Sequence, residues 1–390
     1  MKDPKIYLVL DNCFAIKRWV KPSIWMQVGS DLGIKYMQAS TYNEIDPLFS
    51  SEQYMNSWAE EAKKAEEKHG IKIVNFYTGY QTYRTIGLAH QNETNKSKLI
   101  NSWFHRMIDF SSQFKAGLGF FMFALTEEVL QNSEKYKITS QTFFNNMSEI
   151  ASYAKQKNVQ ISFEQMYTPH QPPWTINQSL DYLRNIYKIA QSPSYITIDV
   201  GHQVGQNKFR KPDKSTIENI VIKKLNSQNL TNIWLGPDTN YEIVTNSSLT
   251  ANQKIKLIIE NIEKYSYLFA EEIDSDVYKW FELTGKYSPI VHLQQHDGTH
   301  SAHDAFTSEK NVKGIIKPDK LLKSLNKSYL SPVEKGLPPV AENIYLSFEI
   351  FGSTSETSRN ILNKIKESIE YWRKYIPQDG MKLSEIVGRL

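Results

Sequence analysis

Short apolar segments rich in β-branched residues alternate with longer helix-like segments along the whole chain. Several of the short segments are nearly continuous apolar runs, as expected of parallel strands buried on both faces. Several helix-like segments stop at a glycine directly before the next strand, as at Gly33 and Gly70, and glycine suits the left-handed conformation that often ends a helix. The repeated alternation of strand and helix predicts an α/β chain folded as a (β/α)₈ TIM barrel.

The same pattern places the expected elements. Strands are expected at residues 5–12, 34–40, 72–77, 117–123, 159–166, 195–200, 289–294 and 343–351. Helices are expected at residues 24–32, 51–69, 96–114, 140–156, 176–190, 252–281, 318–325 and 356–375.

The connection between the sixth and seventh expected strands is much longer than the usual loop. We expect a single domain over residues 1–390, in which residues 205–287 form an insertion. This insertion leaves the barrel beside the catalytic face, so we expect it to be a cap or an oligomer contact. Lys208, Arg210 and Lys211 near its start could meet a substrate phosphate, although a solvated surface is the commoner role of such residues.

Composition excludes several classes of protein. The chain has 390 residues with 40% apolar and 23% charged residues, which argues against disorder. No apolar run approaches the length of about 20 residues that crosses a bilayer, so no membrane association is expected. A lone Cys13 and the lack of a cleavable signal pattern favour a cytoplasmic location. The net charge of +4 is small, so no nucleic-acid partner is expected.

Four residues with metal-binding side chains lie at or near the ends of the last four expected strands: Glu164, Asp199, His292 and Glu349. Parallel strands of a barrel end at the same face, so these side chains should converge. Burying carboxylates without compensation costs several kcal/mol each, and a cation is the simplest partner that would offset this cost. The sequence therefore predicts a site for a divalent cation.

Further polar residues follow these strand ends. His202 comes three residues after Asp199, and Gly201 between them permits a sharp turn. The loop after the seventh expected strand is dense in histidine, and a Pro-stiffened loop follows Glu164. We expect these loops to supply substrate contacts, although the histidines after the seventh strand could also be further ligands or a proton relay. The candidates are His170, Trp174, His202, His296, Asp297, His300 and His303.

With these motifs the chain resembles the xylose isomerase-like barrel superfamily. Its members include sugar isomerases and epimerases, inosose dehydratases and AP endonucleases of the endonuclease IV type, which share one divalent-metal site. The motifs that carry the resemblance are Phe163-Glu164, Asp199-Val200-Gly201-His202, Val291-His292-Leu293 and Phe348-Glu349, in this order, and residues 314–322 resemble the connection that follows the seventh strand.

The resemblance to sugar epimerases of the tagatose 3-epimerase type implies a function. In those enzymes the matching residues bind one divalent ion, so Glu164, Asp199, His292 and Glu349 would hold Mn²⁺, Mg²⁺, Co²⁺ or Zn²⁺. Glu164 and Glu349 would also act as the acid/base pair, and His202 would contact a substrate hydroxyl or the metal. The expected activity is sugar or sugar phosphate isomerisation or epimerisation through a metal-stabilised enediolate, by an enzyme that could be a homo-oligomer.

The sequence leaves three alternatives to an isomerase or epimerase. A metal-dependent dehydratase would use the same apparatus. A nuclease of the endonuclease IV type is disfavoured because the ends of the third and fourth expected strands, residues 76–80 and 120–123, contain no histidine. A non-catalytic carbohydrate-binding barrel is considered because no arginine lies between His292 and Leu330, where the epimerases often have one. Since both Glu164 and Glu349 are present, an enzyme is favoured.

Overall fold

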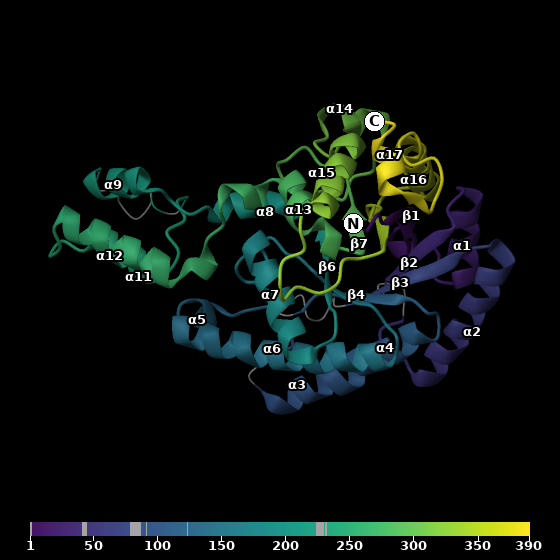
Figure 1. Ribbon diagram of the computed structural model, residues 1–390, viewed down its shortest axis with the longest axis horizontal. Coiled ribbons are helices and arrows are strands. Elements are labelled where there is room, and N and C mark those ends of the chain that lie inside the picture. The colour runs from purple at the N-terminus through teal and green to yellow at the C-terminus, as the bar shows by residue number, and fades with distance from the viewer. Residues whose placement is uncertain are drawn as a thin grey trace.

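Eight parallel strands close into a barrel in the computed structural model, which describes residues 2–40, 45–78, 87–90, 92–122, 124–223, 230 and 232–390 (Figure 1). Each strand pairs with the next in sequence, and β1 pairs with both β8 and β2, so the sheet has no open edge within the barrel. The predicted TIM barrel is therefore confirmed. The strands are β1 (Lys5–Asp11), β2 (Tyr36–Ser40), β3 (Lys72–Thr78), β4 (Gly117–Phe120), β5 (Ile161–Glu164), β6 (Tyr195–Asp199), β7 (Ile290–Leu293) and β8 (Asn343–Phe348).

The strand register brings the carboxyl ends of β5 to β8 to one level. Asp199 of β6 lies opposite His292 of β7, and His292 lies opposite Ser347 of β8. Glu349, the second residue after Ser347, is still tied to β7 because its backbone N–H donates to the carbonyl of Leu293 at 3.0 Å. At the opposite end of the barrel, the short strand β9 (Met381–Lys382) pairs antiparallel with the start of β1.

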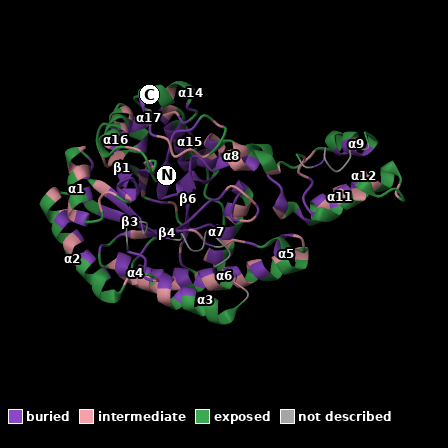
Figure 2. Ribbon diagram, turned by 180° about the vertical axis from the view of Figure 1, so that it is seen from behind, coloured by how far each residue is buried: buried purple, intermediate pink, exposed green. Residues whose placement is uncertain are grey.

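Helices surround the barrel and expose their outer faces (Figure 2). Their ends follow the sequence signals: Ser51 caps the start of α2, and Gly70, with φ of 64°, ends it. Gly33 after α1 also has a positive φ, of 75°. Outside the connection between β6 and β7, which begins with α8 (Gln203–Gln206), the helices are α1 (Pro22–Asp31), α2 (Glu52–His69), α3 (Glu93–Leu99), α4 (His105–Ser112), α5 (Glu127–Leu130), α6 (Ser133–Gln156), α7 (Ile176–Ala190), α14 (Ser308–Lys313), α15 (Pro318–Leu330), α16 (Ser358–Arg373) and α17 (Leu383–Val387).

Some expected boundaries were wrong. The single helix expected over residues 252–281 is two helices, α12 (Ala251–Lys264) and α13 (Val277–Thr284), with short 3₁₀ turns between them. The reason is tertiary, because the backbone of Ala270 bonds to Phe209 and Lys211 at 2.9 Å each and must be extended there. The helix expected over residues 96–114 is α3 and α4 joined by a π-helical segment, Ile100–Phe104. The last residue of the expected strand at 117–123, Phe123, lies outside the described residues.

The middle of the insertion forms an arm beside the barrel. In both ribbon views α9 (Lys214–Ile222), α11 (Asp238–Thr245) and α12 project sideways from the barrel (Figures 1 and 2). At the base of the arm, the ring of Phe209 packs against Trp234 at 4.9 Å and against Trp174 at 5.7 Å, measured between ring centroids. The expected cap and the expected oligomer contact both stay predictions.

In the described part of the chain, no helix combines the length and the apolar character that a membrane span requires.

Candidate metal centre

Glu164, Asp199, His292 and Glu349 converge at the carboxyl end of the barrel. Glu164 ends β5, Asp199 ends β6, His292 lies in β7, and Glu349 directly follows β8. One ligand atom from each residue lies within 4.8 Å of the ligand atoms of the other three. The exposed fractions of these residues are only 0 to 6%. The four predicted ligands thus form one buried group, which we call the ligand cluster.

Direct contacts hold the cluster together around the His292 ring. His292 Nδ1 donates to Glu164 Oε1 at 2.8 Å and lies 3.5 Å from Glu349 Oε2. The other oxygen of Glu164 accepts a hydrogen bond from the Tyr77 hydroxyl. Glu349 Oε2 also lies 3.5 Å from His303 Nδ1. Glu164 and Glu349 therefore face the same imidazole nitrogen, while each has its own second neighbour.

Asp199 is fixed by donors from its own turn and from β7. Its Oδ1 accepts from the backbone N–H of Gly201 at 2.6 Å and from the Gln294 amide at 2.8 Å. His202 Nδ1 bonds to the carbonyl of Gln165 at 2.7 Å, which leaves Nε2 facing Asp199 Oδ2 at 3.8 Å. The Asp-Val-Gly-His turn thus directs both Asp199 and His202 toward the cluster, as the sequence predicted.

The charges of the cluster show why a cation fits. Among the described residues, the ion-pair partners of these three carboxylates are all histidines. Burial raises the pKa of Glu349 well above its usual range, and Asp199 and Glu164 add to this, while His292 opposes it. Burial would lower the pKa of His292, but Glu349 and Glu164 outweigh it and raise that pKa to about 10. Three carboxylates and one imidazole are a donor set suited to a hard or borderline divalent ion, which would relieve this repulsion.

His303 is delivered to the cluster by a hairpin after β7. The backbones of Gln295 and Asp304 pair across this hairpin, and the backbone N–H of His303 donates to Gln294 Oε1 at 2.6 Å. His303 has φ of 47°, a strained value for a residue other than glycine. Its ring also packs edge-on against Phe351.

The other predicted contact residues lie outside the cluster. His296 Nε2 bonds to the carbonyl of Val200, and Asp297 and His300 line a separate cavity of about 640 Å³. His170 pairs with Glu127 at 3.1 Å. Trp174 is fully buried at the base of the arm, where its indole N–H donates to the carbonyl of Tyr267. Substrate contact by these five residues stays a prediction.

Two of the three basic residues near the start of the insertion, Arg210 and Lys211, face acidic neighbours. Arg210 lies 4.0 Å from Glu272, and Lys211 lies 3.9 Å from Glu271, both on partly exposed surface. This arrangement agrees with a surface role for these residues.

Sequence reasoning missed four buried polar residues around the cluster. Gln294 orients Asp199, Tyr77 donates to Glu164, and Gln38 lies 3.0 Å from His292 Nε2, where it also bonds to Asp11. The available signal was a polar side chain in an otherwise apolar strand, as at Gln38 in Tyr-Met-Gln-Ala-Ser.

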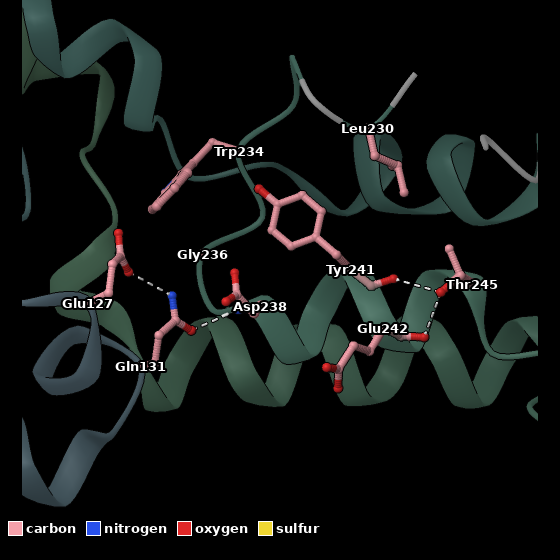
Figure 3. Close-up of a pocket in the computed structure, with 9 residues that line it drawn as sticks. All are labelled: Glu127, Gln131, Leu230, Trp234, Gly236, Asp238, Tyr241, Glu242 and Thr245. Atoms are coloured by element: carbon pink, nitrogen blue, oxygen red, sulfur yellow. Dashed lines mark hydrogen bonds between the residues drawn. The ribbon is translucent and has the colours of Figure 1, made fainter. Parts of the chain in front are cut away.

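A different cavity, of about 660 Å³, lies between α5 and the arm (Figure 3). Trp234 and Tyr241 lie on one side of it, and Glu127 and Gln131 come from the barrel side. No member of the ligand cluster lines it, so it is separate from the candidate metal centre.

Sequence comparisons agree with this geometry. Residues 26–228 match the model of the family described as xylose isomerase-like TIM barrel. The D-erythrulose 1-phosphate 3-epimerase of Brucella abortus (strain 2308) is 29% identical over 127 residues, which make up 32% of this chain and 38% of that protein. The alignment therefore spans less than two thirds of the length of this relative.

Solved structures share the fold at low sequence identity. A Rhodospirillum rubrum ATCC 11170 protein with the provisional name xylose isomerase is 16% identical, with a TM-score of 0.68 over 95% of this chain and 99% of that one. The IOLI protein with a bound zinc atom is 12% identical, with a TM-score of 0.53 over 95% of this chain and 99% of that one.

The structure predicts a steric role for Gly201. A Cβ atom at this position would lie 2.6 Å from the Gln294 side chain, which holds Asp199. Gly201→Ala should therefore lower the free energy of unfolding by about 1–3 kcal/mol, the usual cost of overpacking, as measured by urea denaturation. In a Gln294→Ala background the same substitution should cost much less, because the colliding atoms are gone. An equal cost in both backgrounds would contradict this explanation.

Proposed function

Because the chain belongs to the xylose isomerase-like TIM barrel family, we propose that it is a divalent-metal-dependent isomerase or epimerase that acts on a sugar or sugar phosphate. The observation that carries the proposal is the convergence of two glutamates, an aspartate and a histidine into one buried cluster. The similarity to a D-erythrulose 1-phosphate 3-epimerase supports a small ketose or ketose phosphate as the substrate.

Glu164, Asp199, His292 and Glu349 would hold one ion, and their donor set suits Mn²⁺, Mg²⁺, Co²⁺ or Zn²⁺. The zinc in the related IOLI fold supports a divalent ion of this kind. When bound, the ion would supply positive charge beside the carbonyl and hydroxyl oxygens of a ketose, which makes the hydrogen on the adjoining carbon more acidic.

The two glutamates then carry the proton transfers. One carboxylate takes the proton from the carbon beside the carbonyl, and the C–H electron pair becomes the C=C bond of an enediolate. The other glutamate, protonated at the start, returns a proton to the opposite face, which inverts the configuration at that carbon. Their surroundings differ, because the Tyr77 hydroxyl donates to Glu164 while the His303 ring lies beside Glu349.

We propose that His202 and His303 contact the substrate. His202 Nε2 faces Asp199 from one side of the cluster, and the His303 ring lies beside Glu349. Each can offer a ring nitrogen to a sugar hydroxyl next to the reacting carbon. We propose that they orient the substrate so that the reacting C–H bond points at one carboxylate.

The proposal predicts one tightly held divalent ion. Removing it with a chelator should lower the melting temperature in a thermal denaturation assay, since an ion at 100 times its Kd stabilises the fold by about 2.7 kcal/mol. Asp199→Ala should lose the ion in elemental analysis, whereas His300→Ala, outside the cluster, should keep it. Equal metal content in wild type and Asp199→Ala would contradict the assignment.

The acid/base roles predict a large effect of removing either carboxylate. Glu164→Gln and Glu349→Gln should each lower kcat by about a hundredfold or more, while each amide can still offer one oxygen to the ion. Glu67→Gln, on the exposed face of α2, is the control and should turn over normally. Near-normal turnover by either cluster variant, with its metal content verified, would remove that residue from proton transfer.

The reaction itself can be found by isotope incorporation. Metal-supplemented protein is incubated with free and phosphorylated ketoses in D₂O, and the products are read by NMR. Deuterium at C3 would indicate 3-epimerisation, and deuterium at C1 or C2 would indicate aldose–ketose isomerisation. A product lighter by one water would indicate the dehydratase alternative instead, and no incorporation across the panel would count against the proposal.

A further inference from the structure

A network of buried polar side chains contacts His292 at Nε2, the ring nitrogen that does not face the other members of the ligand cluster. His292 Nε2 lies 3.0 Å from the Gln38 amide nitrogen of β2, and this nitrogen also donates to Asp11 of β1. The amide oxygen of Gln38 accepts from Asn75 of β3 at 2.7 Å. Asp11, Gln38 and Asn75 are at most 1% exposed, so water does not replace these bonds.

Strand β4 leaves space for these buried side chains. A Cβ atom at Gly117 would lie 2.8 Å from the Asn75 side-chain oxygen, and one at Gly119 would lie 3.2 Å from its nitrogen and 2.9 Å from the Tyr77 ring. Both distances under 3.0 Å are closer than packed atoms tolerate. The two glycines thus allow β3 to direct Asn75 and Tyr77 across the barrel toward Gln38 and Glu164.

We propose that Gln38 is a positioning residue for the metal centre, which sets the ring orientation and the proton position of His292, and that Asp11 and Asn75 hold Gln38 in place. The inference rests on the proposed metal-dependent function. A histidine that binds a metal through one ring nitrogen usually bonds through the other to a fixed partner, which orients the ring. Here Nδ1 faces Glu164 and Glu349, and Nε2 faces Gln38.

The position of the His292 ring proton specifies which atom of the Gln38 amide must face Nε2. With a metal at Nδ1, the ring proton sits on Nε2 and needs an acceptor. Half a turn of the Gln38 amide exchanges its nitrogen and oxygen in place and presents the oxygen to Nε2. Asp11 must then donate its own proton to that oxygen, which agrees with the rise in the pKa of Asp11 caused by burial. Asn75 completes the exchange by turning its amide in the same way.

Gln38→Met tests the inference because it keeps the length of the side chain and removes its hydrogen bonds. Isothermal titration of chelator-treated protein with Mn²⁺ should show a Kd about 10–100-fold higher than that of wild type, the usual effect of losing such a partner. Gln206→Met is the matched control: Gln206 is also a fully buried glutamine, but it bonds to backbone carbonyls near Trp174. Its Kd should be unchanged.

A second set of variants distinguishes hydrogen bonding from packing. Gln38→Glu offers Nε2 an acceptor but buries a second acidic group against Asp11, which leaves one proton for two carboxyl groups, so it should bind Mn²⁺ weakly. Adding Asp11→Asn replaces the Asp11 carboxyl group with an amide donor, so the double variant should regain most of the lost affinity. In the Zn²⁺-loaded double variant, ¹⁵N NMR should show the His292 proton on Nε2, as in wild type.

The outcomes separate the two proposals. Absence of Mn²⁺ binding by wild type would overturn the proposed function and this inference with it. Binding by wild type with an unchanged Kd in Gln38→Met would overturn this inference alone. If Gln38→Met does not fold, the pair of Glu variants decides: a double variant no better than Gln38→Glu would overturn the role of Gln38, and recovery would support it.

Discussion

The burial of three carboxylates at one end of the barrel is the constraint on which the rest of the site depends. Glu164, Asp199 and Glu349 lie within 4.8 Å of one another and of His292, with almost no exposure to water. Their mutual repulsion is costly in a medium that screens charge poorly. A bound cation lowers that cost, and the same cation would provide the charge that a ketose needs to lose a proton from carbon.

The site consists of the ligand cluster and of a second group of side chains that contact the cluster, and the two groups come from different strands. Strands β5 to β8 supply the ligands, while β1 to β3 supply the side chains that hold them: Asp11, Gln38, Asn75 and Tyr77. Strand β4 contributes space instead of side chains, through Gly117 and Gly119. If the proposed function holds, this division gives β1 to β4 a supporting role that their largely apolar sequence does not indicate.

No member of the ligand cluster comes from the insertion. Near its start, the amide of Gln206 donates hydrogen bonds to the carbonyls of Met166 and Trp174 and so connects the insertion to the loop after β5. Its middle is a helical arm with an apolar interior formed by residues such as Ile217, Ile220 and Ile258. The aromatic packing of Phe209 with Trp174 and Trp234 fixes the base of the arm. The loop that carries His170 and Trp174 therefore packs against the insertion.

The sequence by itself determined the barrel, the convergence of Glu164, Asp199, His292 and Glu349, and the Asp-Val-Gly-His turn. Each depends on local order, because periodicity sets strand or helix and parallel strands of a barrel end at one face. Only the tertiary structure decided the rest. The break in the helix expected at 252–281, the return of His303 over Glu349, the withdrawal of Trp174 into the base of the arm and the contact of Gln38 with His292 all join residues far apart in the chain. Such contacts form only when the closed barrel brings distant segments together. A single sequence gives the side chains but not which of them will be in contact.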